Sequence, residues 1–237
     1  MLTQAEQDNI WDHHQNRSRT AFDLSYPRLR FLAERCQPGA RVLTIGVGNG
    51  HLERLLVARN LELYSLDPSP DSIARLRDEL AMGTRAQQGY GQNIPFESGL
   101  FDKVIMTEVL EHLPSDVLHS TLDEVRRVLK PGGRFIGTVP YREDLEANEV
   151  VCPHCSNTFR RWGHEQTFDR AALMSLLAQH RFEIERVYPR AFADFRRWRP
   201  RLLLRAVFRH VLGLIGEPIV GPNLYFCVRR SAKIDAR

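Results

Sequence analysis

The sequence predicts an α/β protein built on a mostly parallel sheet. Short apolar runs bounded by turn residues alternate along the chain with segments of helical spacing, which is typical of strands joined by crossover helices. The run at residues 41–45 leads directly into a glycine-rich turn, and a second apolar run ends at Asp67. Parallel strands of this kind are joined by right-handed connections, and they place ligands beyond their carboxyl ends.

The composition fits one buried core, because 43% of the 237 residues are hydrophobic. No apolar run approaches the ~20 residues needed to cross a bilayer. The polar N-terminus has no apolar region like that of a secretory signal, so we expect a cytoplasmic protein. Four cysteines do not make a disulfide framework.

The net charge of +4 is unevenly distributed. Residues 186–230 carry ten arginines against Asp194 and Glu217, whereas the preceding part of the chain is acidic overall. This asymmetry argues against a nucleic-acid binder that uses its whole surface, and it indicates one local anionic partner.

The expected elements follow one another in a single domain, 1–237. Helices are expected at the N-terminus and over residues 27–35, 51–59, 71–80, 116–129 and 167–180. Strands are expected over residues 41–45, 61–66, 103–106, 134–139, 182–187 and 224–228. We divide the domain into an N-terminal helical cap (1–38), a cofactor-binding core (39–140), an insertion with a CxxC motif (141–166) and a basic amphipathic insertion (190–222).

The glycine-rich turn predicts a nucleoside site. Gly46-Val47-Gly48-Asn49-Gly50 follows a strand and precedes a helix, so glycine can take a positive φ and a ligand can lie against bare backbone. The Asp67 carboxylate, at the end of the next strand, can accept both hydroxyls of a ribose. The dinucleotide pattern GxGxxG would need glycine where His51 stands.

The motifs resemble those of the class I S-adenosylmethionine (SAM)-dependent methyltransferases. RVLTIGVGNGHLERLL, LYSLDPSPDSI, QQGYGQNIPFESGLFDKVIMTEVLEHL, LKPGGRFIGTVPY and HEQTFDRAALMSLLAQHRFEIERV occur in the family's order over roughly residues 40–190. The resemblance implies a Rossmann-like, seven-stranded sheet with helices on both faces and an antiparallel last strand. It also implies a set of SAM-binding residues: Gly46, Val47, Gly48, Gly50, Asp67, Pro68, Tyr90, Gly91 and Thr107.

Two positions depart from the family pattern. The family usually has an acidic residue where Thr44 stands, near the methionine end of SAM, and another where Tyr90 stands, near the adenine. Tyr90 is expected to stack on the adenine instead.

Glu111 and His112 are the candidate catalytic residues, because they fall just past the fourth motif strand. His112 would act as a general base with Glu111 setting its tautomer. The alternative is that the pair serves only loop structure. A third reading, from a resemblance to small-RNA 2′-O-methyltransferases, is a divalent-metal quartet of Glu108, Glu111, His112 and His164.

Cys152 and Cys155 form a CxxC pair of the kind that gives two thiolates to one zinc, and His154 and His164 are the candidates to complete the shell. The alternative is two free cysteines in a turn. The surrounding segment, CPHCSNTFRRWGHEQTF, also resembles bacterial methyltransferases associated with cell-surface glycan and glycolipid assembly. Its aromatic residues and arginines suit a sugar and a phosphate.

The basic segment 197–215 predicts an amphipathic helix. Four arginines recur every four residues: Arg197, Arg201, Arg205 and Arg209. Such a helix suits peripheral contact with the inner face of the membrane. A lid helix and an RNA phosphate track are the alternatives.

The expected function is SAM-dependent O-methylation of a saccharide or a lipid-linked small molecule. A quinone precursor and small RNA are the alternative acceptors, the latter with metal assistance. An inactive SAM-fold binding module is the alternative from another class, and Thr44 and Tyr90 are the residues that favour it.

Overall fold

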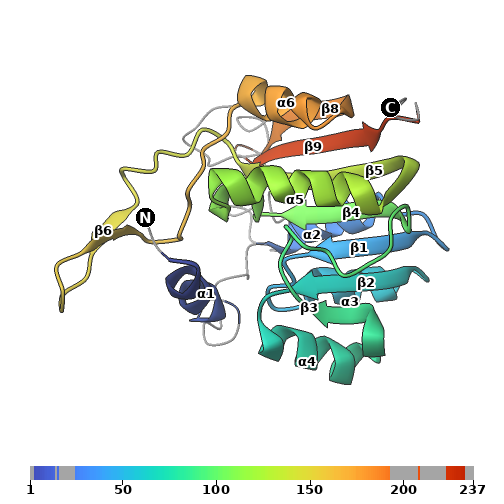
Figure 1. The fold of residues 1–237 in the computed structure, drawn as a ribbon, viewed down its shortest axis with the longest axis horizontal. Coiled ribbons are helices and arrows are strands. Elements are labelled where there is room, and N and C mark those ends of the chain that lie inside the picture. Colours follow the sequence, from blue (N-terminus) through green and yellow to red (C-terminus); the bar gives the residue numbers. More distant parts are fainter. Residues whose placement is uncertain (1–2, 14, 16–24, 193–207, 209–222, 233–237) are drawn as a thin grey trace.

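The computed structural model describes residues 3–13, 15, 25–192, 208 and 223–232. Its centre is a seven-stranded sheet of order β3-β2-β1-β4-β5-β9-β8 (Figure 1). The strands are β1 (Arg41–Ile45), β2 (Glu62–Asp67), β3 (Ala86–Gln88), β4 (Phe101–Thr107), β5 (Leu129–Pro140), β8 (Phe182–Arg190) and β9 (Asn223–Arg230). β9 pairs antiparallel with both β5 and β8, while the strands from β3 to β5 pair in parallel. The predicted seven-stranded sheet with its last strand antiparallel is confirmed.

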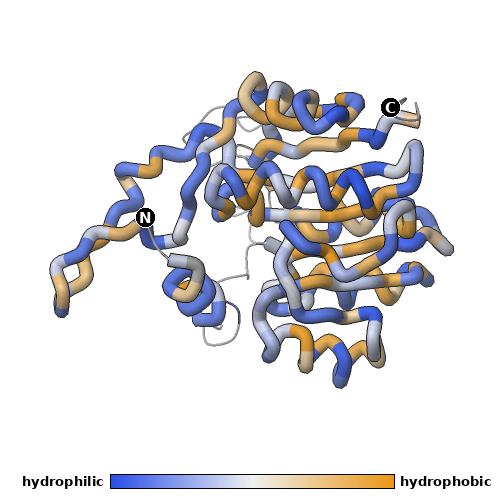
Figure 2. Tube along the Cα trace, in the orientation of Figure 1, coloured by the Kyte–Doolittle hydropathy of each residue, from blue (hydrophilic) through white to orange (hydrophobic). Residues whose placement is uncertain are grey.

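Helices cover both faces of the sheet, and each face has its own apolar core. The helices are α2 (Tyr26–Ala33), α3 (His51–Val57), α4 (Pro70–Leu80), α5 (Ser115–Val128) and α6 (Arg170–Gln179). One core joins buried residues of α5 and α6 to the sheet, and the other joins those of α2, α3 and α4. Figure 2 shows the apolar residues concentrated along the strands of the sheet.

Strong local signals fix where several elements begin and end. β1 has the predicted bounds because its apolar run is followed at once by the glycine turn. The Ser69 hydroxyl caps α4 by accepting the backbone N–H of Ser72, and Pro70 occupies the first turn, where proline is tolerated. The Asp169 carboxylate caps α6 in the same way through Ala172.

Three strands were not predicted: β3, β6 (Glu149–Val151) and β7 (Thr158–Arg160). Each has only three residues, which is too short for a periodic pattern to be read from sequence. β6 and β7 pair antiparallel as a separate hairpin, and the CxxC motif lies in the segment between them.

The first helix, α1 (Gln4–Asp12), begins with a capping box in which Thr3 and Glu6 bond each other's backbone N–H. Figure 1 shows α1 and the β6–β7 hairpin on the same side of the molecule, beyond the carboxyl ends of the parallel strands. This is the side on which an α/β sheet binds its ligands. Among the described helices, none is both long and apolar enough to cross a bilayer.

Candidate active site

The glycine turn after β1 takes the backbone conformation predicted for it. Gly46, Gly48 and Gly50 have φ of 83°, 57° and 76°, which only glycine adopts without strain. A Cβ on Gly46 would also lie 2.5 Å from a methyl carbon of Val109. The turn therefore leaves bare backbone at the start of α3, as the nucleoside site requires.

Asp67 holds this turn against the end of β2. Its Oδ2 accepts the backbone N–H of Val47 at 2.6 Å, and its Oδ1 accepts that of Ser69 at 2.8 Å. The carboxyl group is fully buried, and burial raises its pKa to about 6 against the opposing effect of these backbone N–H donors. Each carboxylate oxygen has two lone pairs, so both can still accept a ribose hydroxyl.

The N-terminal segment covers this part of the site. The Tyr90 hydroxyl donates to the Asp8 carboxylate of α1 at 2.8 Å. The Ser72 hydroxyl lies 3.1 Å from the side-chain oxygen of Gln15 and 3.2 Å from the carbonyl oxygen of Gly48. These contacts place Asp8 beside Tyr90, and Gln15 beside the glycine turn.

Several of the other predicted SAM-binding residues also lie at the strand ends. The Thr107 hydroxyl, at the end of β4, is 2.7 Å from the Thr138 hydroxyl on β5. The carbonyl of Pro68 accepts a hydrogen bond from Gln88 at 3.0 Å, which joins the ends of β2 and β3. Gly91 has no room for a side chain, because a Cβ there would lie 2.8 Å from the Thr121 methyl group.

The acidic residue that the family usually carries at the position of Thr44 has a substitute in the structure, because a buried carboxylate lies beside Thr44. Glu53 of α3 is fully buried, and neither of its oxygens has a well-formed hydrogen bond within the described structure. Burial raises the pKa of Glu53 to about 7, and the nearby Thr44 hydroxyl opposes this only in part. α3 thus supplies an acidic group close to the position where the family usually carries one on β1.

Sequence reasoning missed Glu53, although a signal for it was present. Leu52, Glu53 and Leu56 are the buried residues of α3, and helical spacing places all three on one face. An acidic residue on an otherwise apolar helix face is rarely buried without a specific role.

Replacing Glu53 with glutamine is expected to remove a large pH dependence of stability. The folded protein holds a proton on Glu53 up to about pH 7, whereas the unfolded chain loses it near 4.5. The unfolding free energy therefore falls as pH rises from 4.5 to 7, by about 3 kcal/mol from this group. Denaturant unfolding of wild type and Glu53→Gln should diverge over this range, with the variant more stable at pH 8.

The exposed Glu97 provides the matched control for this measurement. Glu97→Gln should follow the wild-type curve at every pH. If the wild-type and Glu53→Gln curves run parallel from pH 4.5 to 8, then Glu53 ionises in the folded protein as it does in the unfolded chain, and the prediction is wrong.

The predicted catalytic pair lies in a short 3-10 helix, η3 (Leu110–His112), just past β4. Glu111 does not orient His112 by a hydrogen bond, because neither carboxylate oxygen has a partner within the described part of the chain. Nδ1 of His112 lies instead 3.3 Å from the Trp11 indole nitrogen and 3.4 Å from the Gly163 carbonyl. The ring is held by α1 and by the segment that follows the β6–β7 hairpin.

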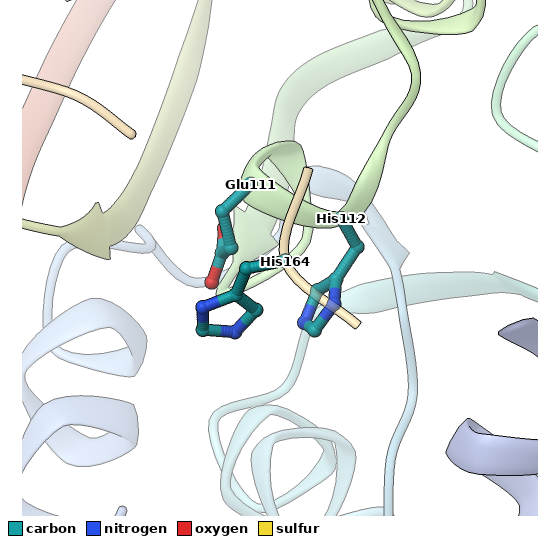
Figure 3. Close-up of side chains that lie close together, drawn as sticks. All are labelled: Glu111, His112 and His164. Carbon is teal, nitrogen blue, oxygen red and sulfur yellow. The ribbon is translucent and has the colours of Figure 1, made fainter. Parts of the chain in front are cut away.

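His164 belongs to this cluster and not to the CxxC motif. One ligand atom each from Glu111, His112 and His164 lie within 4.8 Å of one another, and Figure 3 shows the three side chains converging. This is the only such group of three among the described residues, so the structure does not bring the predicted set of Cys152, Cys155 and His164 together. The spacing along the chain favoured the cysteines, but the fold carries His164 back to η3.

The two cysteines remain a pair of free thiols at the hairpin. Cys155 is exposed, and Cys152 is half-buried. Backbone N–H groups of Cys155 and His154 lower the pKa of Cys152, which favours its thiolate. Two thiolates do not complete a zinc shell, and no third ligand joins them within the described residues.

Glu108 is not part of the cluster around Glu111. Its carboxylate accepts hydrogen bonds from Thr138 at 2.9 Å and Asn223 at 2.8 Å, and it forms a salt bridge with Arg28 at 3.1 Å. Of the metal quartet considered from the sequence, the structure therefore brings three members together. The fourth, Glu108, bonds to other side chains. The basic segment 197–215 lies outside the described residues apart from Phe208.

The sheet order, the glycine turn and the carboxylate at the end of β2 define a Rossmann-like nucleoside-binding protein. Comparison with known proteins narrows this class. Residues 43–137 match the family described as "Methyltransferase domain". The matched residues make up less than half of the chain, and the similarity over them is to methyltransferases.

Curated relatives share this part of the chain. An uncharacterized methyltransferase of Synechocystis is 34% identical over 98 residues, which are 41% of this chain and 46% of the relative. The ubiquinone biosynthesis O-methyltransferase of Xylella fastidiosa is 30% identical over 136 residues, 54% of each chain. The chain thus matches about half the length of these relatives.

Solved structures share the fold over nearly the whole chain. The 1,6-didemethyltoxoflavin-N1-methyltransferase of Burkholderia thailandensis, solved with S-adenosylhomocysteine, superimposes with a TM-score of 0.63 at 17% identity. The match covers 98% of this chain and 92% of the other. At this identity the similarity concerns the fold.

Proposed function

We propose that the protein transfers the methyl group of SAM to an oxygen of a small-molecule acceptor, a saccharide or a lipid-linked compound. The observation that carries the SAM part is the glycine turn, held by Asp67 at the carboxyl ends of β1 and β2. SAM supplies an electrophilic methyl group when bound. The residues of the chain would hold its ribose at Asp67 and its adenine beside Tyr90.

Methyl transfer requires two things of the protein: it must align the reacting atoms, and it must allow removal of a proton from the acceptor. The acceptor oxygen, the methyl carbon and the sulfur must lie in line, and a hydroxyl acceptor must lose its proton. The cluster of Glu111, His112 and His164 lies just past β4 and offers imidazole nitrogens for this purpose. In this proposal the acceptor hydroxyl lies against that cluster.

A saccharide acceptor is supported by the segment beside the cluster. Trp162 is 41% exposed, and it precedes Gly163, whose carbonyl contacts His112. Exposed indole rings stack well on the apolar face of sugars. Replacing Trp162 with alanine is expected to raise the KM for a saccharide acceptor about tenfold while leaving SAM affinity unchanged. Steady-state kinetics at saturating SAM, together with a SAM titration, check this; an unchanged KM removes the stacking role.

Calorimetric titration with SAM and S-adenosylhomocysteine tests the proposed cofactor. Micromolar binding supports an enzyme, whereas no heat at millimolar ligand supports the inactive binding module. The acceptor class is tested with radiolabelled SAM and three kinds of acceptor: lipid-linked saccharides, catechol quinone precursors and short RNA. Transfer to a quinone precursor alone would favour a function like that named for the Xylella relative.

A further inference from the structure

We propose that Glu111, His112 and His164 bind one divalent transition-metal ion beside the acceptor site. Their ligand atoms lie within 4.8 Å of one another, from two segments more than fifty residues apart in sequence (Figure 3). Donor atoms around a tetrahedral zinc are separated by about 3.4 Å, so small side-chain rotations bring the three into range. Two imidazoles and one carboxylate with further positions open are a donor set typical of catalytic zinc and of iron(II).

Glu111 gives the strongest reason to expect a cation here. The residue is 1% exposed, and both carboxylate oxygens lack a hydrogen-bond partner in the described structure. A buried carboxylate without a partner is costly, and it either takes up a proton or binds a cation. Arg28 forms its salt bridge with Glu108, and it forms none with Glu111 in the described structure.

The surroundings of His164 are those of a metal ligand. Its Nδ1 bonds the carboxylate of Glu143, and the side chains of both residues are largely buried. Histidine ligands commonly donate one ring N–H to a carboxylate in this way, which fixes the tautomer and directs Nε2 to the metal. Asn148 in turn donates to the other oxygen of Glu143 at 2.9 Å, so the carboxylate is itself held in place.

Backbone hydrogen bonds join the η3 residues Glu111 and His112 to the segment that carries His164. The carbonyl oxygen of Glu111 accepts the N–H groups of Glu165 at 2.7 Å and Gln166 at 2.9 Å. Gln7 of α1 donates to the Gly163 carbonyl at 3.1 Å and also to the carbonyl of His112. Because His164 lies between these contacts, its position beside Glu111 is built into the fold.

The Gly163 carbonyl lies beside Nδ1 of His112, as the Glu143 carboxylate lies beside Nδ1 of His164. The Trp11 indole N–H donates to Nδ1 of His112, so binding of a metal at Nε2 requires the ring proton to move to Nδ1, where the Gly163 carbonyl oxygen, 3.4 Å away, would accept its hydrogen bond. The Trp11 indole nitrogen lies 3.3 Å from the same Nδ1, and the Trp11 and His112 rings meet edge to face at 5.1 Å. A metal ion in the cluster is therefore close enough to quench the fluorescence of Trp11.

The role of the ion in catalysis rests on the proposed function, whereas its binding does not. A metal-held hydroxyl is more acidic, so its proton passes to solvent water more readily. The acceptor oxygen then bonds to the methyl carbon as the carbon–sulfur bond breaks, and S-adenosylhomocysteine leaves. When the ion is bound, the two histidines act as its ligands, and the proton goes to solvent water instead of to an imidazole.

Metal binding is tested directly with protein that carries no polyhistidine tag and has been stripped by a chelator. Cobalt(II) is titrated and followed by its visible absorption and by tryptophan fluorescence, and zinc then competes for the site. We expect one ion per chain from this cluster. Glu111→Gln and His164→Asn should each weaken binding about 100-fold or more, and Glu143→Gln about tenfold. Glu111→Gln also serves as the folding control, because it removes an unpartnered buried charge and keeps the shape of the side chain.

The double variant Cys152→Ser/Cys155→Ser separates this site from the CxxC pair, and it should bind cobalt as the wild type does. Trp11→Phe should lose most of the fluorescence quenching. The proposal is overturned if the stripped wild-type protein binds no cobalt, if Glu111→Gln and His164→Asn bind it unchanged, or if the cysteine variant loses it. SAM titrated into metal-free wild-type protein tests the proposed function separately, so the failure of one proposal is distinguishable from the failure of the other.

Discussion

Replacing Asp67 with asparagine is expected to weaken SAM binding about 100-fold, because hydrogen bonds to a charged acceptor contribute about 1.5–3 kcal/mol each. The carboxylate accepts the N–H groups of Val47 and Ser69, and it is the group that would hold the ribose hydroxyls. An amide at this position turns one of its two acceptors into a donor, which must face a backbone N–H or a ribose hydroxyl. Calorimetric titration with SAM measures the loss.

Asp102 provides a matched control, because it too is a carboxylate that accepts a backbone N–H, that of Arg41 at 2.9 Å. It lies near the start of β4, away from the carboxyl ends of the strands. Asp102→Asn should therefore leave SAM affinity unchanged even if it lowers thermal stability. Equal SAM affinities of wild type and Asp67→Asn would show that Asp67 serves only to hold the turn.

The same carboxylate gives a pH dependence of binding. Burial raises the pKa of Asp67 to about 6, so the group is largely protonated below that pH in the folded protein. A ribose that requires two acceptors should bind less tightly as pH falls through this range. The Asp67→Asn variant should not show this loss.

Replacing Gly137 with alanine is expected to destabilise the protein by at least about 4 kcal/mol, because the clash involves backbone. An added Cβ would lie 1.9 Å from the carbonyl oxygen of Met106 and 2.6 Å from the ring of Phe226. Gly137 pairs with Met106 on β4 and with Phe226 on β9, so neither neighbour can move without breaking the sheet. Denaturant unfolding, or loss of soluble protein at expression, measures the effect.

Gly99 provides the control for the general effect of removing a glycine. It has φ of 68°, and nothing lies within 4 Å of an added Cβ. Gly99→Ala should therefore cost only the backbone strain of about 1–2 kcal/mol. If both variants lose the same stability, the sheet accommodates the extra carbon at Gly137 and the clash argument is wrong.

The elements predicted correctly from sequence are those with a pattern of their own. β1 and α3 are separated by three glycines, and α5 shows an apolar stripe that continues to its end at Val128. The short strands β3, β6 and β7 carry no such pattern. Each of them is defined by a partner strand, and a pairing of three residues cannot be recognised from one segment alone.

The candidate site also contains residues whose positions could be predicted from the sequence and residues whose positions could not. The glycine turn and Asp67 are close to their strand ends in sequence, so their meeting could be predicted from parallel topology. His164 could not be placed, because its position depends on hydrogen bonds that join residues 163–166 to η3 and α1. The spacing to Cys152 and Cys155 suggested a different set of ligands, which the fold does not assemble.

The sequence by itself determined the class of fold, the order of its motifs and the residues of the glycine turn, because local patterns of hydropathy and positive φ depend on neighbours in the chain. The tertiary structure alone decided which charged groups are buried together. Glu53 lies beside Thr44, and Glu111 lies beside His164, because packing brings distant segments into contact and removes water from between them. Burial, and with it the cost of an unpaired charge, is a property of the folded chain and not of any one segment.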